Sequence, residues 1–333
     1  MTRQKSFGVT WRTSPKAIRR SWMLNIQTMA FLFDSFESWK QYAIDHGQSL
    51  TTVVLDYELE QKGRSHEETL KGLRAAWEVM KSAVNSGLND EMVSRSGMIN
   101  NGAKKVYRHP IPVLSVEFQR LVSRALAAKE VNSCMGRIVA APTAGASGIM
   151  PGILYTLQEI HHIDDDKIID AMLLAAGTAL IMEQKASIAG AVGGCQAETG
   201  TAAAMGAASI VYCLGGNTDQ IFNAIAITVQ CMLGLVCDPV AGLVEVPCVV
   251  RNASAAAIAN SSAQIAIADV SSVIPVDEVI EAMGEIGASM ESRYKETAQG
   301  GLAATRTGQA IARRVLIHDI EILPDKSEEQ NQS

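Results

Sequence analysis

Two long apolar segments most constrain what this chain can fold into. Residues 168–182 and 221–236 are nearly all apolar and rich in small residues, with little of the polar–apolar alternation that is typical of a half-buried strand. Each is shorter than the roughly 20 residues that cross a bilayer, and the second carries Asn223 and Gln230. These segments therefore predict core helices of a soluble protein rather than membrane spans.

The sequence around these segments is also helical in pattern. Apolar residues recur three or four positions apart within residues 34–92, as in Leu70, Leu73 and Trp77. A similar spacing resumes in residues 113–131, after a stretch rich in glycine, asparagine and proline. We therefore predict an all-α fold, with Ala/Gly-rich helices in one domain over residues 23–322.

Both ends of the chain differ from this domain in composition. Residues 1–22 are basic without one acidic residue, and residues 323–333 are polar, so we predict that both segments are disordered. The apolar stretch after the leader contains two polar residues and no small-residue cleavage site follows it, which argues against a signal peptide. Two alternatives could explain the basic leader: it is a transit peptide, or the protein begins at a later methionine. We expect a cytoplasmic protein with reduced thiols.

The charge balance excludes two classes of partner. The chain has 29 Lys and Arg against 35 Asp and Glu, a net charge of −6, and a net-negative surface does not attract nucleic acid or an anionic membrane without a local basic patch. Charged residues make up only 19% of the chain, which leaves little solvated surface. We therefore expect partner chains to cover part of the surface, and no nucleic acid or membrane partner.

Three polar, glycine-rich segments interrupt the apolar helices: residues 141–152, 193–200 and 237–248. The first carries Thr143 and Ser147 and is suited to opening a helix, where free backbone N–H groups bind a carboxylate or phosphate. It lacks the Gly-Lys-Ser/Thr ending of a phosphate-binding loop. A tight turn without a ligand is the alternative interpretation of this segment.

The six cysteines divide into two groups. Three lie in the glycine-rich segments, where irregular backbone allows their thiols to converge on one point: Cys195, Cys237 and Cys248. The other three lie in helical runs, where a cysteine usually packs as a small apolar residue: Cys134, Cys213 and Cys231. The spacing of the first group matches no zinc or ferredoxin pattern, so spacing by itself indicates a metal site only weakly.

Longer motifs carry a resemblance to a known family. The segments concerned are residues 140–152, 194–198, 237–242, 246–248, 251–252 and 295–303. In order and in register, from about residue 70 to 315, they resemble the iron–sulfur L-serine dehydratases. The resemblance is to the catalytic alpha chain, which implies a separate beta subunit as partner and a role in amino-acid degradation and gluconeogenesis.

The resemblance implies a cofactor and a reaction. The cluster cysteines of the family fall on Cys195, Cys237 and Cys248, which would hold a 4Fe–4S cluster in which one iron has no protein thiolate. Such an iron is a Lewis acid. The implied activity is that of an L-serine ammonia-lyase, which eliminates water from L-serine and gives pyruvate and ammonia without pyridoxal phosphate.

The roles of the other motif residues stay open at the level of sequence. Thr143 and Ser147 are candidates for anchoring the substrate carboxylate or amine, or they cap a helix. Glu198 and Lys295 either orient the cluster or substrate, or form a structural ion pair. The pair Lys104-Lys105 is better explained as solvated than as a carboxylate partner.

The sequence does not identify the catalytic base. By their ordinary pKa the candidates are His109, His161 and His162, although the acidic run after His162 places that residue at the surface. Two rival functions also remain. One is a cysteine-desulfurating relative with the same type of cluster, and the other is an inactive scaffold subunit whose cysteines only pack.

Overall fold

Short polar side chains begin many of the helices. Ser35, Ser49, Ser65 and Ser115 each accept a hydrogen bond from a backbone N–H of the first helical turn, as N-cap residues do. Asp164 does the same for a later helix. These caps set the helix starts in the computed structural model, which describes residues 33–322.

Within residues 33–322 the secondary structure is helical, and no strand forms there beyond the isolated bridges Val93–Asn100 and Cys237–Lys295. The helices are α2 (Phe36–His46), α3 (Leu50–Lys62), α4 (His66–Asn89), α5 (Gly102–Arg108), α6 (Val116–Ser133), α7 (Ile149–His161), α8 (Asp165–Ala186), α9 (Gly190–Gly193), α10 (Cys195–Cys213), α11 (Thr218–Gln230), α12 (Cys248–Ile267), α13 (Val276–Ser289) and α14 (Arg306–Ile322), with the short 3-10 segments η1 (Val240–Gly242), η2 (Ser292–Tyr294) and η3 (Gly301–Ala304). The predicted all-α class is confirmed.

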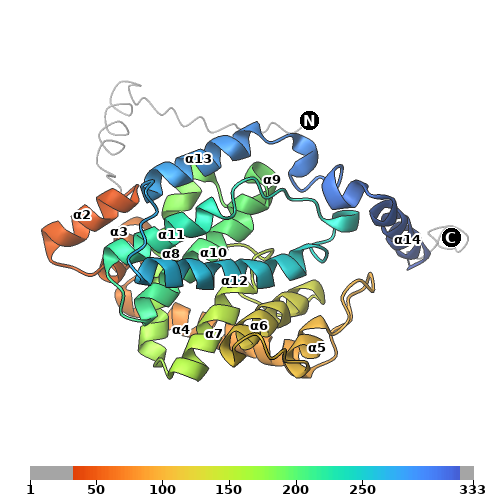
Figure 1. The fold of residues 1–333 in the computed structure, drawn as a ribbon, viewed down its shortest axis with the longest axis horizontal. Helices are drawn as coiled ribbons and strands as arrows, with labels where there is room; N and C mark the ends of the chain where they lie inside the picture. Colours follow the sequence, from red (N-terminus) through yellow and green to blue (C-terminus); the bar gives the residue numbers. More distant parts are fainter. Residues whose placement is uncertain (1–32, 323–333) are drawn as a thin grey trace, which may run out of the picture. The chain divides into compact units, whose positions relative to one another are not determined.

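Helix α10 is the central element of the core. It packs against α7, α8, α11 and α12, and nearly all of its side chains are buried (Figure 1). Small residues make this possible: a Cβ on Gly206 would lie 2.3 Å from the Cδ1 atom of Ile153 in α7. The glycine therefore permits the close approach of α7 and α10, in agreement with the small-residue composition of this region.

The two apolar segments that led to the fold prediction have different outcomes. Residues 168–182 lie inside α8, whose apolar side chains are buried. The helix in the second segment, α11, ends at Gln230, so the prediction that residues 221–236 are all helical is wrong at its end. A turn follows because Gly234 has a positive φ of 79°, which favours glycine, and it leads the chain directly to Cys237.

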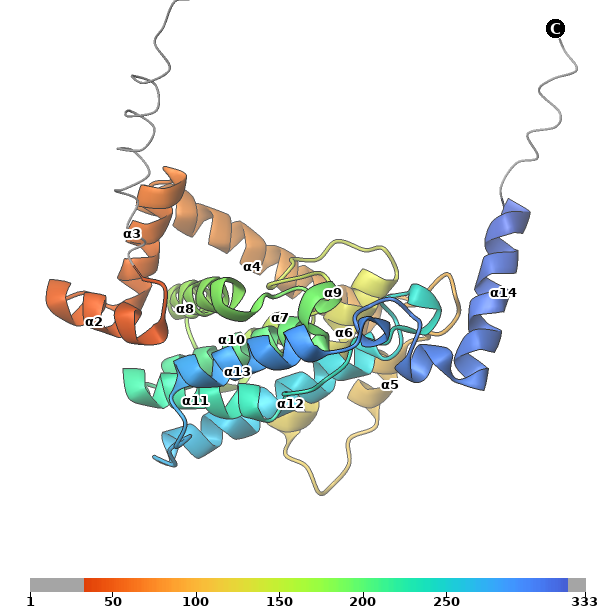
Figure 2. The same cartoon turned by 90° about the horizontal axis from the view of Figure 1, so that it is seen from above.

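The chain returns to the same region after α13. Residues 290–304 contain η2 and η3, and α14 packs against η1 and η3 before it extends away from the core at one end of the ribbon (Figure 2). The described residues thereby bring the segments around 141–148, 190–198, 236–248 and 294–302 together. The predicted leader at residues 1–22 and tail at 323–333 lie outside the described residues.

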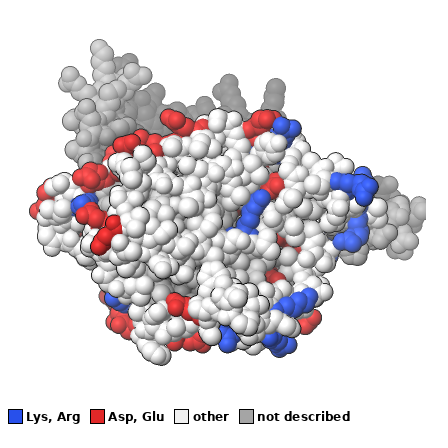
Figure 3. All heavy atoms as spheres, viewed as in Figure 1, with Lys and Arg blue, Asp and Glu red and all other residues white. Residues whose placement is uncertain are grey.

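The surface is poor in charge over the central helices. On the face seen in Figure 3, most Lys, Arg, Asp and Glu side chains lie along the edges, and a broad uncharged area lies to the left of a basic group near the middle. Large apolar side chains are exposed elsewhere, with Val113 85% and Val116 65% accessible. No helix among the described residues is both long and apolar enough to cross a membrane.

Candidate functional site

The three cysteines of the glycine-rich segments lie in one buried region. Cys195 is the first residue of α10, Cys248 is the first residue of α12, and Cys237 lies in the linker that follows α11. Their side chains are only 1%, 5% and 2% exposed, respectively, and all three are free thiols. The prediction that all three lie in irregular backbone is wrong for Cys195 and Cys248. Both occupy helix N-termini, where free N–H groups and the helix dipole favour a thiolate.

Two of these sulfurs and one carboxylate converge closely. The Sγ atoms of Cys195 and Cys237 and a carboxylate oxygen of Glu198 all lie within 4.8 Å of one another. Cys248 lies outside this tight group, but it is close enough that the charge of Cys195 raises the pKa of its thiol. The potential ligands of this site are therefore the three cysteine sulfurs and the carboxylate of Glu198.

The thiols differ in acidity. The hydrogen bond with Cys237 and the positive charge of Arg251 hold the pKa of Cys195 below its ordinary value, despite burial. Cys237 has a raised pKa because of its hydrogen bond to Cys195 and its burial. Burial and the charge of Cys195 raise the pKa of Cys248 to about 12. Burial thus opposes ionisation of Cys237 and Cys248, whereas a bound metal group would favour all three as thiolates.

A partly buried ion pair supports Cys195. The Nη1 atom of Arg251 lies 3.6 Å from Cys195 Sγ and donates to the carbonyl of Val236 at 2.8 Å. The Nη2 atom lies 2.8 Å from Asp238 Oδ1, and Asp238 Oδ2 accepts a hydrogen bond from the N–H of Leu302 at 2.7 Å. Asp238 therefore connects the arginine to the C-terminal segment that closes over the site.

The predicted motif around Lys295 pairs with the cysteine linker through its backbone. The N–H of Cys237 donates to Tyr294 O, and the N–H of Glu296 donates to Cys237 O, both at 2.8 Å. The ammonium of Lys295 has no hydrogen bond or ion pair with any described residue. The structural ion pair considered for Glu198 and Lys295 is therefore not formed.

Glu198 instead faces the first glycine-rich segment. Its carboxylate accepts a hydrogen bond from the hydroxyl of Thr143, so Thr143 orients Glu198 rather than capping a helix. The Nδ2 atom of Asn252 donates to Gly145 O at 2.8 Å, and its Oδ1 atom accepts from the N–H of Gly148 at 2.9 Å. This asparagine fixes residues 143–148 against the start of α12.

Ser147 is buried in the same segment without a partner. Its side chain is 1% exposed, and its hydroxyl makes no hydrogen bond within the described part of the chain. A buried hydroxyl that lacks a partner costs free energy unless a ligand or water satisfies it. Ser147 is therefore a free donor in the segment that contacts Glu198 and the start of α12.

The backbone of Gly190 approaches Cys237 closely. A Cβ built on Gly190 would lie 3.3 Å from Cys237 Sγ, 3.4 Å from an oxygen of Glu198 and 3.6 Å from an oxygen of Glu296. The absence of a side chain at this position thus leaves a cradle between one sulfur and two carboxylates. Burial and the charge of Glu198 raise the pKa of Glu296. Soft thiolate donors around such a space suit an iron–sulfur group, so the residues present fit the expected cofactor.

Two buried charged residues near the site were not identified from the sequence. Lys129 of α6 is fully buried, and its amine donates to Ala144 O at 3.4 Å. Glu245 precedes Cys248 and accepts hydrogen bonds from Ser94 and Ser96, both at 2.6 Å. A signal exists for Lys129, because it follows Leu121 and Ala125 at helical spacing and so lies on the buried face of α6.

The histidine and lysine candidates lie away from the cysteines. His109, His161 and His162 are exposed, and His161 pairs with Glu117 at 2.8 Å. The amines of Lys104 and Lys105 donate to backbone carbonyls of Asn89 and Asn100. The lysine pair is structural, and none of these histidines contacts the site, so the base remains unidentified among them.

The remaining cysteines do not all pack in the core. Cys213 is buried at the end of α10, which confirms the core prediction for this residue. Cys134 is half-buried at the end of α6, and Cys231 is exposed at the end of α11. The prediction of core packing is therefore wrong for Cys231, because the helix ends there and its thiol faces solvent.

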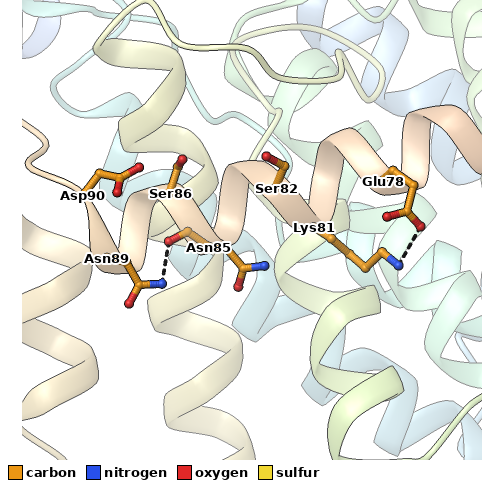
Figure 4. Close-up of a pocket in the computed structure, with 7 residues that line it drawn as sticks. All are labelled: Glu78, Lys81, Ser82, Asn85, Ser86, Asn89 and Asp90. Carbon is orange, nitrogen blue, oxygen red and sulfur yellow. Dashed lines mark hydrogen bonds and ion pairs between the residues drawn. The ribbon is translucent and has the colours of Figure 1, made fainter.

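A separate polar groove follows one side of α4 (Figure 4). Its lining includes Lys81 with Glu78 and Asn89 with the backbone of Asn85, pairs that lie within the same helix. None of the predicted site residues lines this groove. Its lining residues include no cysteine or histidine, so the groove shows no chemistry comparable with the cysteine site.

Comparisons with known proteins agree with these observations. The family model described as "Serine dehydratase alpha chain" matches residues 45–303. The chain is 42% identical to the L-serine dehydratase, alpha chain, of Peptoniphilus asaccharolyticus over 275 residues, which cover 82% of this chain and 94% of that protein. It is 41% identical to the probable L-serine dehydratase, alpha chain, of Bacillus subtilis over 80% of this chain and 89% of that one. It is also 36% identical to the L-serine dehydratase of Streptomyces coelicolor, over 84% of this chain and 63% of that protein.

Proposed function

This chain belongs to the serine dehydratase alpha chain family, and from this premise we propose that it is an L-serine ammonia-lyase that converts L-serine into pyruvate and ammonia. The observation that carries the proposal is the convergence of Cys195, Cys237 and Glu198 within 4.8 Å inside the matched region. Membership of a family whose named relatives are L-serine dehydratases supports a lyase.

The proposed cofactor is a 4Fe–4S cluster on Cys195, Cys237 and Cys248. Three buried thiols, two of them at helix N-termini, provide the thiolate ligands that such clusters use. When bound, the cluster would supply an iron with an open coordination position, which acts as a Lewis acid on the hydroxyl leaving group of serine.

The protein residues around the cluster would hold the substrate and shape the site. Arg251 donates toward the sulfur of Cys195 and helps to lower the pKa of this thiol, while Thr143 holds Glu198 toward the cysteines. We assign the free hydroxyl of Ser147 as a donor to the substrate carboxylate, since it is buried and unpartnered beside the site. Lys295 and Glu296 border the cysteine linker and would face the substrate from the other side.

The proposed partner is a separate beta subunit. Two of the relatives are named as alpha chains, and the Streptomyces coelicolor protein extends beyond the region that matches this chain. The charge-poor face in Figure 3 supports an interface with another protein chain, because charged residues are depleted at the centre of interfaces.

We also propose that one helical catalytic domain covers residues 23–322 and that the protein acts in the cytoplasm, in the degradation of amino acids. Residues 33–322 fall within one compact unit, which supports the domain over that range, while residues 23–32 lie outside the described part of the chain. All six cysteines are free thiols, which suits a reducing compartment.

The experiment that tests this function is anaerobic purification with and without a beta chain. Iron, acid-labile sulfide and the visible spectrum are measured first, and pyruvate release from L-serine and L-cysteine is then compared. About four irons and four sulfides per chain, with turnover of L-serine, would support the proposal. Preferred turnover of L-cysteine with release of sulfide would favour a desulfurating relative. A folded, iron-free and inactive chain in the presence of the beta subunit would favour a scaffold.

A further inference from the structure

Lys129 is a buried cation without an acidic partner. Its side chain is 0% exposed, and its amine contacts only neutral acceptors, the amide oxygen of Asn132 and the carbonyl of Ala144. Among the described residues no carboxylate lies within ion-pair distance of it. An isolated buried ammonium is unfavourable, and lysine is seldom fully buried unless it is paired.

The anionic groups around Lys129 point to the cysteine site. Burial lowers the pKa of Lys129, whereas Cys248, Glu198, Glu245 and Cys195, in this order, raise it. The two carboxylates already accept hydrogen bonds, Glu198 from Thr143 and Glu245 from Ser94 and Ser96. The segment that Lys129 contacts through Ala144 O is joined to Cys248, because Asn252 Nδ2 donates to Gly145 O at 2.8 Å and to Cys248 O at 2.9 Å. Lys129 therefore lies on the Cys248 side of the site.

The cation that contacts Cys195, Arg251, is already balanced. Arg251 forms an ion pair with Asp238 at 2.8 Å, so its positive charge is largely offset inside the protein. Lys129 approaches from the opposite element, α6, and lies beneath residues 144–148: its Cβ is 3.0 Å from the position of a Cβ on Gly148. Among the described residues, an additional anion in the site would thus meet a fully buried cation without an ion pair, Lys129, whereas the other unpaired ammonium of the site, that of Lys295, is only half-buried.

We propose that Lys129 is a positioning residue for the iron–sulfur cluster, whose buried amine balances the negative charge of the cluster on the side of Cys248. This inference rests on the proposed function, because it requires a cluster on the three cysteines. Three thiolates give a 4Fe–4S cluster a net negative charge, and opposite charges attract strongly in a low-dielectric interior. In the cluster-free chain the same amine has no counter-charge, so it should weaken the fold rather than support it.

The test compares Lys129→Met with the wild-type chain, both prepared anaerobically with the beta subunit. We expect the variant to retain several-fold less iron and sulfide under a chelator, and the remaining cluster to have a more negative reduction potential, since a nearby positive charge favours the reduced form. The cluster-free variant should unfold at the same or a higher temperature than the cluster-free wild type. A merely structural lysine would move the unfolding temperature downward and leave the potential unchanged.

Two further variants complete the test. Lys40→Met removes an exposed lysine that pairs with Asp219 on the surface, and it should change neither iron retention nor potential. Lys129→Gln keeps a polar group toward Asn132 and Ala144. If Lys129→Met does not fold, iron retention and reduction potential are measured on Lys129→Gln instead. Equal iron retention and an equal reduction potential in the wild type and the Lys129 variants would overturn the inference. A variant with wild-type iron retention and potential but a raised KM for serine would overturn it as well. A wild-type chain without iron would instead refute the proposed function.

Discussion

Arg251 Nη1 lies 3.6 Å from the sulfur of Cys195, although Arg251 is in the first turn of α12, Cys195 begins α10, and the two residues are 56 positions apart in sequence. The guanidinium reaches across from α12 to the first residue of α10 and is held there by Asp238. The site is thus assembled by two helix starts that share one cation. Contacts of this kind couple the cysteine chemistry to the stability of the surrounding fold.

The pair of Arg251 and Asp238 should therefore contribute to stability. We expect Arg251→Gln to lower the free energy of unfolding of the cluster-free chain by about 3 kcal/mol, because it leaves the carboxylate of Asp238 buried without its cation. Denaturant unfolding measures this change. Asp238→Asn should cost a similar amount, and the double variant should cost clearly less than the sum. Additive losses would show that the two side chains do not interact.

Replacement of individual cysteines separates the two groups. Cys195→Ser, Cys237→Ser and Cys248→Ser should each abolish cluster binding, since each removes one of three thiolate ligands. Cys231→Ser should be neutral, because its side chain is exposed at the end of α11. Iron and sulfide content per chain gives the answer. Equal loss of iron in all four variants would contradict the assignment of the ligands.

Many of the helices and the three site cysteines can be predicted from the sequence, and the predictions that are wrong have physical reasons. The apolar run inside α8 is long enough to identify a core helix by composition. The helix start at Cys195 is hidden, because Gly193 and Gly194 resemble a loop in sequence, whereas Gly194 provides a single residue of positive φ, 76°, between α9 and α10. A local pattern cannot distinguish these two uses of glycine.

Long-range pairs are beyond any local pattern. The contact between the motif at Lys295 and the linker at Cys237 is made by backbone atoms, so no pattern of side chains in the sequence indicates it. Lys129 lies on the apolar face of α6, and this spacing indicates that it is buried. Only the fold shows that it has no ion pair with any described residue and that Cys248 is close enough to affect its pKa. The three cysteines are identified by the resemblance to a known family, whereas the cations near them, Arg251 and Lys129, are identified only by the structure.

Gly190 provides a steric test of the cradle. A Cβ in Gly190→Ala would lie 3.3 Å from Cys237 Sγ and within 3.6 Å of Glu296, so it would enter the proposed cluster space. We expect iron content to fall at least several-fold while the cluster-free chain keeps its unfolding temperature. Gly72→Ala on α4 is the matched control, since a Cβ there meets nothing within 4 Å. That change should add about 0.5–1 kcal/mol of helix stability and leave iron unchanged. Full iron content in Gly190→Ala would place the cluster elsewhere.

Cys213 makes the stability of the cluster-free chain depend on alkaline pH. Burial raises the pKa of this thiol from 9.0 to about 12 in the folded chain. The unfolded thiol releases its proton from about pH 9 upward while the folded one keeps it. Its contribution to stability is therefore complete below about pH 9 and is lost as the pH rises toward 12, by about 1.4 kcal/mol per pH unit. Urea unfolding of wild type and Cys213→Ala at pH 8 to 11 checks this. Parallel pH profiles of the two chains would show that Cys213 is not the responsible group.

Ser147 allows the substrate assignment to be tested apart from the cluster. Its hydroxyl has no partner within the described part of the chain, so Ser147→Ala removes an unsatisfied buried group and should leave the unfolding temperature unchanged or slightly higher. If the hydroxyl donates to the serine carboxylate, KM should rise about tenfold or more, because a hydrogen bond to a charged group contributes about 1.5–3 kcal/mol. Steady-state assays of the assembled enzyme with intact cluster give this number. Ser209→Ala is the matched control: that buried hydroxyl donates to Met205 O at 2.9 Å, so its loss should affect stability and not KM. An unchanged KM in Ser147→Ala would remove Ser147 from the substrate site and leave its buried hydroxyl to an ordered water.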